Sequence, residues 1–131
     1  MEVGVIMNLD YLNDRQKEAV LYGDGPLLIL AGAGSGKTSV LTKRVAYLIK
    51  ERNVSPSNIV AITFTNKAAK EMKERIIKEV GKAGYDIQIS TFHSFGLRII
   101  KENYEKLGYE KNFTIIDSDD SLTVVKKILK E

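Results

Sequence analysis

A glycine-rich segment carries the strongest chemical signal in this chain. Residues 31–38 read Ala-Gly-Ala-Gly-Ser-Gly-Lys-Thr and directly follow the apolar run Leu-Leu-Ile-Leu at 27–30. Glycines let the backbone turn tightly, so its N–H groups can point inward at phosphate oxygens, and a helix that begins there adds its positive end. Lys37 can reach the β- and γ-phosphates of a nucleotide, and the Thr38 hydroxyl can ligate Mg²⁺.

The segment therefore predicts a nucleotide-phosphate site in which Lys37 and Thr38 are the chemically active side chains. Ala31 stands where the strict pattern has glycine, which is a mild departure. The residues expected to form the site are Ala31, Gly32, Ala33, Gly34, Ser35, Gly36, Lys37 and Thr38.

Gln16 is a candidate for recognising the base of the nucleotide. Adenine presents its N6 donor and N7 acceptor side by side, and a carboxamide can bond to both at once. Asn13 can cap a helix that begins just before Gln16, so the side chain would lie in the first turn. Glutamines on helix surfaces are common, and spacing alone favours that simpler interpretation.

Two further blocks suit a nucleic acid. Residues 63–69 read Thr-Phe-Thr-Asn-Lys-Ala-Ala and end one expected strand, and residues 90–95 read Ser-Thr-Phe-His-Ser-Phe and end another. Ligands bind at the carboxyl ends of parallel strands. Bases can stack on an aromatic ring while polar groups hold the phosphates of a single strand. Phe64 is explained equally well as a core residue, because phenylalanine is commonly buried.

The second block leaves its own alternatives. His93 is the only histidine, and with no cysteine in the chain it is poor evidence for a metal site. It can contact a phosphate or sugar, or it can cap a helix. Phe92 and Phe95 are expected in the core.

The hydrophobic pattern alternates helix and strand. Strands are expected over residues 27–30, 59–63 and 87–91, with a short one over 113–116, and helices over 14–22, 37–52, 67–80, 93–107 and from about 118 onward. Asn66 is the expected cap of the third helix and Gly81 its end. Strands that alternate with helices predict an α/β fold with a parallel sheet and right-handed crossovers.

Two charged segments are expected to do no chemistry. Residues 113–117 resemble a strand that ends in a magnesium-holding acid, but the Ser-Asp-Asp-Ser that follows favours Asp117 as a helix cap. The chain contains no Asp-Glu pair. Residues 67–82 are rich in lysine, with Glu71/Arg75 and Glu74/Lys78 spaced for ion pairs along a solvated helix.

Composition sets outer limits. With 131 residues, 44% hydrophobic and 28% charged, the chain is expected to be one soluble globular domain. The lack of cysteine excludes disulfides, thiol catalysis and cysteine–zinc sites, and fits the cytoplasm, which is the expected location. No apolar run approaches a membrane span, and residues 3–7 lack the basic leader of a secretory signal. The net charge of +3 permits an anionic partner without identifying one.

Taken in order, these blocks resemble the N-terminus of the UvrD/Rep/PcrA-type superfamily 1 DNA helicases, from Leu12 to about Lys130. In that family Leu-Asn-x-x-Gln is the adenine-recognising Q motif, which gives Gln16 that role. Residues 31–38 correspond to motif I, Ala31 included. Residues 63–69 look like motif Ia and residues 91–94 like motif Ib, both of which touch single-stranded DNA in the family.

The resemblance assigns DNA contacts to Phe64, which stacks on bases, and to Thr65, Asn66, Thr91 and His93. It implies a RecA-like P-loop NTPase fold, a parallel sheet with flanking helices. Residues 1–113 would be the N-terminal part of the ATP-binding subdomain 1A, and residues 114–131 the beginning of the helical subdomain 1B. The implied parent is an ATP-dependent helicase that moves 3′ to 5′ on single-stranded DNA with ATP and Mg²⁺, and repair or replication proteins are its candidate partners.

The family's Asp-Glu motif and its motifs III to VI do not occur in this chain. We therefore expect the chain alone to lack ATP hydrolysis. Three alternatives stay open: the helicase subunit of a helicase–nuclease, a nucleotide- or DNA-binding module without turnover, and an unrelated phosphate-loop ATPase, which motifs Ia and Ib disfavour.

Overall fold

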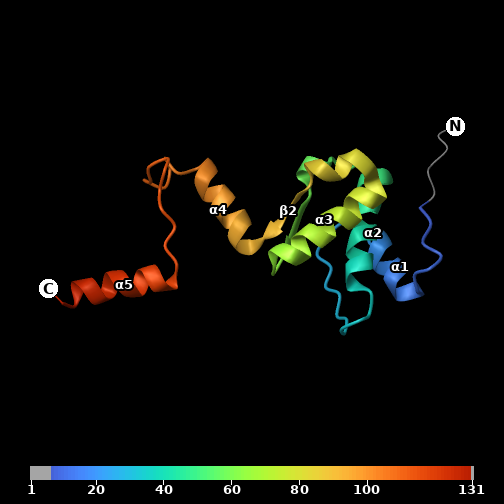
Figure 1. The fold of residues 1–131 in the computed structure, drawn as a ribbon. Coiled ribbons are helices and arrows are strands. Elements are labelled where there is room, and N and C mark those ends of the chain that lie inside the picture. The colour runs from blue at the N-terminus through green and yellow to red at the C-terminus, as the bar shows by residue number, and fades with distance from the viewer. Residues whose placement is uncertain (1–6, 131) are drawn as a thin grey trace. The chain divides into compact units, whose positions relative to one another are not determined.

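The computed structural model describes residues 7–130, so most of the 3–7 stretch considered for a secretory signal lies outside the described residues. The elements in chain order are α1 (Asp14–Leu21), α2 (Lys37–Lys50), the 3₁₀ turn η1 (Pro56–Asn58), β1 (Val60–Thr63), α3 (Asn66–Val80), the 3₁₀ turn η2 (Gly81–Asp86), β2 (Gln88–Thr91), α4 (Phe92–Glu102) and α5 (Ser118–Ile128). The chain divides into two compact units, residues 1–95 and 96–131. Figure 1 shows the elements along the chain.

The sheet of the first unit has two parallel strands, β1 and β2, joined through α3. The register pairs Val60 with Gln88 and, at the carboxyl ends, Thr63 with Thr91. This confirms the strands expected over residues 59–63 and 87–91, their parallel direction and the α/β content. Because the last residues of the two strands pair with each other, the residues that follow the strands leave the sheet side by side.

The core of the first unit lies where α2 and α3 meet the sheet. Ile59, Met72, Ile76 and Ile87 form one buried cluster, against which side chains of α2 pack. Leu12, Ala19, Val20 and Val40 form a second cluster between α1 and α2. Helix α2 contacts both α1 and α3 and lies between them (Figure 1). The helix that follows the glycine-rich segment is therefore fixed on two sides.

The expected strand over residues 27–30 is wrong. These residues form no ladder with any part of the described chain, and the side chains of Leu28 and Leu30 are 82% and 87% exposed. A strand exists only when a neighbour pairs with its backbone, and an apolar run is buried only when both of its faces are covered. The short strand considered over residues 113–116 is also absent, with Ile115 and Ile116 exposed.

Helix ends follow the local signals with two exceptions. Asn13 caps α1, and Gly81 ends α3 with a left-handed φ of +70°, as expected. The cap of α3 is Thr65 and not Asn66: the Thr65 hydroxyl accepts a hydrogen bond from Ala68 N at 3.1 Å. The helix expected over residues 93–107 ends at Glu102 and continues only as turns.

In the second unit, Asp117 caps α5 as expected. Its carboxylate accepts from Asp120 N at 2.8 Å, and the Asp120 carboxylate accepts from Asp117 N at 3.3 Å, which completes a capping box. No residue of α5 is buried. Because it forms this capping box, Asp117 has a structural role within the second unit.

Candidate functional site

The glycine-rich loop leads directly into α2, which begins at Lys37 as expected. Gly34 and Gly36 have φ of +74° and +80°, the left-handed region that favours glycine. A Cβ at position 36 would also lie 3.0 Å from the Gln16 Nε2, so the Gln16 side chain would have to shift slightly. Glycine at positions 34 and 36 therefore lets the loop adopt this conformation without backbone strain.

Lys37 and Ser35 close the loop. The Lys37 ammonium donates to the Ala31 carbonyl at 3.1 Å, and the Ser35 hydroxyl donates to the Gly32 carbonyl at 2.6 Å. Thr38 lies in the first turn of α2 and is exposed. A charged amine at the loop and the free N–H groups of a helix start are the donor set that a polyphosphate requires, so these residues fit a nucleotide.

Gln16 lies against this loop, and its side chain is partly buried rather than fully solvated. Its Nε2 donates to the Ser35 carbonyl at 3.0 Å, and its Oε1 accepts from Asn13 N at 3.0 Å in the capping box of α1. A carboxamide has two donor hydrogens and two acceptor lone pairs, so one of each is left for a base. The structure therefore brings Gln16 to the glycine-rich loop, 19 residues away in sequence.

A cavity of about 220 Å³ lies at this junction. Gln16, Ser35 and Lys37 contribute polar atoms to its lining, and Ile29 and Leu30 contribute apolar surface. A pocket with apolar walls and a few convergent polar groups is the usual form of a small-molecule site.

Arg44 fixes α1 on α2 and so holds Gln16 in place. Its guanidinium donates to the carbonyls of Tyr22 at 2.8 Å, Ala19 and Val20 at 3.2 Å each, and Gly23 at 3.3 Å, all at the end of α1 or just beyond it. These carbonyls have no partner within the helix, and a cation complements the negative end of its dipole. No sequence pattern indicates this role for Arg44, because its contacts span more than 20 residues.

An ion pair stabilises the turn between α1 and residues 27–30. Arg52 donates to both carboxylate oxygens of Asp24, at 3.0 and 3.1 Å. A hydrogen bond with Tyr47 and the charge of Asp24 raise the pKa of Arg52 above its ordinary value, so the guanidinium stays ionised.

The carboxyl ends of β1 and β2 carry an exposed aromatic pair. Phe64 follows Thr63, Phe92 follows Thr91, and the two ring centroids lie 6.0 Å apart with the planes tilted by 57°. Phe64 is 92% exposed, so it is not a core residue of this chain. Phe92, which was expected in the core, is 58% exposed. That expectation was wrong because Thr91, the last strand residue, takes the buried position at this turn.

The other residues assigned to DNA differ in how much of each side chain is exposed. Asn66 and His93 are exposed beside it, and Thr65 is exposed while its hydroxyl caps α3. Thr91 is 7% exposed, and its hydroxyl accepts from Ser94 N at 3.2 Å. Phe95, also expected in the core, is partly buried. Thr91 thus mainly supports the start of α4, whereas the other polar residues are open to a ligand.

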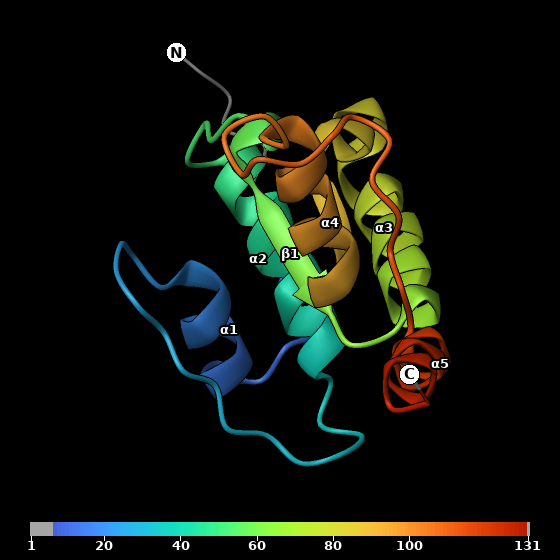
Figure 2. The ribbon, with the colours of Figure 1, turned by 90° about the vertical axis from the view of Figure 1, so that its left-hand side faces the viewer.

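The glycine-rich loop and the aromatic pair lie at the same end of the first unit. Figure 2 shows the arrowhead of β1 and the first turn of α2 pointing to that end. The residues expected to bind phosphates and those expected to bind nucleic acid therefore lie toward the same end of the first unit.

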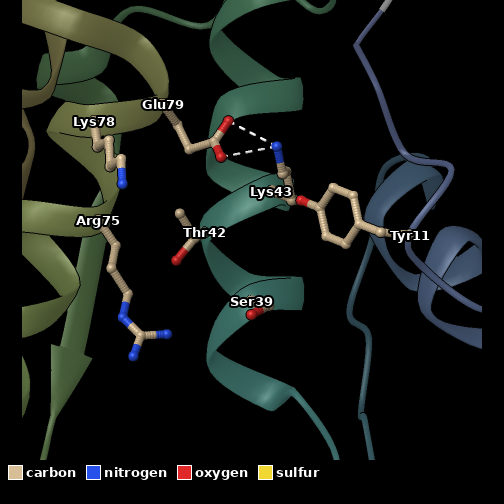
Figure 3. Close-up of a pocket in the computed structure, with 7 residues that line it drawn as sticks. All are labelled: Tyr11, Ser39, Thr42, Lys43, Arg75, Lys78 and Glu79. Carbon is tan, nitrogen blue, oxygen red and sulfur yellow. Dashed lines mark hydrogen bonds and ion pairs between the residues drawn. The ribbon is translucent and has the colours of Figure 1, made fainter.

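A second cavity, of about 300 Å³, lies between α2 and α3. Figure 3 shows Lys43 between Glu79 and the ring of Tyr11. The Lys43 ammonium is 2.8 Å from the Glu79 carboxylate and 5.2 Å from the Tyr11 ring centroid, so its charge is already neutralised. Arg75 and Lys78 line the same cavity. This pair joins two helices rather than marking a reactive site.

The ion pairs expected along α3 do not form. In the described part of the chain, no ion pair joins Glu71 to Arg75 or Glu74 to Lys78. Residues 7–130 also contain no helix long and apolar enough to cross a membrane, and no cluster of three or more His, Asp or Glu side chains suited to a metal ion.

Comparisons with known proteins agree with this geometry. The family model for the UvrD/REP helicase N-terminal domain matches residues 12–131. The chain is 57% identical over 122 residues to the ATP-dependent DNA helicase PcrA of Staphylococcus aureus strain Mu50, which covers 93% of this chain and 17% of that protein. It is 57% identical over 123 residues to the ATP-dependent DNA helicase PcrA of Bacillus subtilis strain 168, with 94% of this chain and 17% of that protein covered.

The chain thus spans 17% of the length of these relatives. The match covers the glycine-rich loop, Gln16 and both blocks that end the strands. On this evidence the chain belongs to the UvrD/REP helicase family, within the N-terminal domain of that family.

Proposed function

We propose that this chain is the N-terminal ATP- and single-strand-binding part of an ATP-dependent DNA helicase that moves 3′ to 5′. The observation that carries the proposal is the joint placement of Gln16, the glycine-rich loop and Lys37 around one cavity. We further propose that the two-stranded sheet belongs to a RecA-like fold, with residues 1–113 in subdomain 1A and residues 114–131 opening subdomain 1B. The two relatives are ATP-dependent DNA helicases by name, which supports the proposed activity.

In the proposed nucleotide site, each side chain has a distinct task. Lys37 exchanges its bond to the Ala31 carbonyl for the β- and γ-phosphates, and the loop N–H groups hold the remaining oxygens. Gln16 uses its free donor and lone pair to bond adenine N7 and N6. Thr38 would be the protein ligand of Mg²⁺, which when bound neutralises charge on the phosphates.

In the proposed DNA site, the exposed ring of Phe64 stacks on a base. Thr65, Asn66 and His93 lie around the ring, where the sugar-phosphate backbone would pass, and the small exposed part of Thr91 completes the set. Stacking is tolerant of sequence because every base has a π face. A DNA strand at this position would lie at the same end of the unit as the nucleotide, so a change at the loop has a short path to the DNA.

Substitution of Lys37 tests the proposal in the full-length protein. We expect DNA-stimulated ATP hydrolysis by the unmodified protein and none by Lys37→Ala, with folding retained because Lys37 is exposed. A matched control is Lys50→Ala, an exposed lysine at the other end of the same helix, which should leave turnover unchanged. Hydrolysis that survives Lys37→Ala would remove the nucleotide site from this loop.

A second candidate function applies to the chain alone. The sequence contains no Asp-Glu pair to hold Mg²⁺ and activate water. The isolated chain would then act as a binding module without turnover, and repair or replication proteins are proposed partners of the full-length protein only.

A further inference from the structure

Phe92 lies within the block at residues 91–94, but its exposed ring is not among the residues assigned to DNA, which in this block are Thr91 and His93. It begins α4 directly after β2, and 58% of its surface is exposed. An exposed phenylalanine beside a second one is unusual for a soluble surface, where large apolar side chains usually occur singly. The two rings together form an apolar patch at the proposed DNA site.

The position of Phe92 follows from the register of the sheet. Thr63 and Thr91 are paired, so the residues that leave the two strands are neighbours at the same edge. The ring centroids of Phe64 and Phe92 are 6.0 Å apart, within the range of a favourable aromatic contact. Phe64 is 92% exposed, so its ring is open to solvent apart from contacts such as this one.

The tilt of the two rings limits what they can bind. Their planes meet at 57°, so one flat base cannot stack on both rings at once. Each ring can take its own base only if neighbouring bases are separated from one another. Bases in a duplex stay stacked and paired, whereas those of a single strand can be splayed apart.

We propose that Phe92 is a second base-contacting residue and that, with Phe64, it forms a two-ring surface for adjacent unstacked bases of single-stranded DNA. This inference rests on the proposed function. Phe92 acts in two ways: it presents its own ring to a base, and it holds the ring of Phe64 in a fixed orientation. Removal of either ring therefore weakens the contribution of the other.

A double-mutant cycle in the full-length protein tests the proposal. Binding of a fluorescein-labelled oligothymidylate is measured by anisotropy for Phe64→Ala, Phe92→Ala and the double variant. Loss of one stacked base corresponds to roughly a 5- to 150-fold weaker affinity, and we expect Phe92→Ala to fall in this range. The double variant should lose less than the product of the two single effects, because residues in contact are coupled.

Tyr85→Ala is the matched control. Tyr85 is 63% exposed, similar to Phe92, but it precedes β2 and so lies at the amino end of the same strand. Its removal should leave DNA affinity unchanged. Phe92→Leu keeps apolar volume and removes the ring, so it serves if Phe92→Ala fails to fold, and it should also weaken binding.

The outcomes separate this inference from the proposed function. If Phe64→Ala weakens binding and the two Phe92 variants do not, Phe92 is no base contact, while the DNA site stands. If no substitution of either ring changes affinity, the DNA site itself is misplaced. If Phe92→Leu lowers the melting temperature and leaves the affinity of the folded protein unchanged, Phe92 serves packing alone and the inference is overturned.

Discussion

Residues 27–30 and residues 60–63 were both expected to form buried strands, but in the described chain only the second segment forms a strand. The first segment, Leu-Leu-Ile-Leu, has no ladder partner within the described chain and exposes Leu28 and Leu30. The second, Val-Ala-Ile-Thr, pairs along its full length with β2 and lies beside the core cluster of Ile76. An apolar run therefore shows only that a segment is able to form a strand, whereas a neighbouring segment decides whether it does.

The same difference separates the two proposed sites. The aromatic pair follows two strands that pair along their full length. The glycine-rich loop is held by Gln16 and Arg44 on one side, but it follows the unpaired segment 27–30. We therefore expect the DNA side to work in the isolated chain and the nucleotide side to bind without turning over.

The largest expected effect concerns hydrolysis. The purified chain should hydrolyse ATP more slowly than the full-length protein by a factor on the order of 10³–10⁵, the contribution of a transition-state arginine alone. Steady-state phosphate release with single-stranded DNA present measures this. DNA-stimulated turnover by the chain that disappears in Lys37→Ala would show that the catalytic acid lies within it, and Asp117 would then be the first residue to test.

The next effect concerns stability. Ile76 is fully buried between α3 and the sheet, so Ile76→Ala should lower the free energy of unfolding by roughly 2–5 kcal/mol. Leu28→Ala removes a side chain that is 82% exposed and should change it by less than about 0.5 kcal/mol. Denaturant titrations of the two variants compare the segments directly. If both variants lost the same free energy of unfolding, residues 27–30 would be packed in solution.

Phe64→Ala should weaken single-strand binding by about 1–3 kcal/mol, with little dependence on base identity. Its ring is 92% exposed, so the melting temperature should barely change. A buried phenylalanine would instead cost roughly 3–5 kcal/mol of stability. Affinity and thermal unfolding measured on the same preparation distinguish these cases, and a large drop in melting temperature with unchanged affinity would return Phe64 to the core.

The smallest expected effect concerns the base of the nucleotide. Gln16→Ala should reduce the preference for ATP over GTP by about 1 kcal/mol, the low end for a bidentate contact, because part of the amide is already used by Asn13 and Ser35. Gln16→Glu is the control, since it keeps an acceptor for the capping box and loses the donor to N7. If the unmodified protein uses both nucleotides equally well, Gln16 has no role in base selection.

Local signals in the sequence were sufficient for much of this fold. The caps Asn13 and Asp117 and the end of α3 at Gly81 depend on residues within a few positions of one another. The residue pattern also brought out the glycine-rich loop, which needs only its own glycines and the helix after it.

Long-range contacts could not be obtained in this way. The pair between Lys43 and Glu79 spans 36 residues, and Arg44 reaches carbonyls more than 20 residues away. Phe92 was misplaced because the burial of a ring depends on which strand residue turns inward beside it. Periodicity reports which face of an element is apolar, but it does not report what lies opposite that face.

The unpaired segment 27–30 has a practical consequence for solution behaviour. It combines four consecutive aliphatic side chains with backbone N–H and C=O groups that pair with no strand of residues 7–130. Such a segment is a template for pairing between molecules. Preparations of the isolated chain should therefore self-associate as concentration rises, which light scattering would detect. An added charge at position 28 should suppress this association and leave the folded first unit intact.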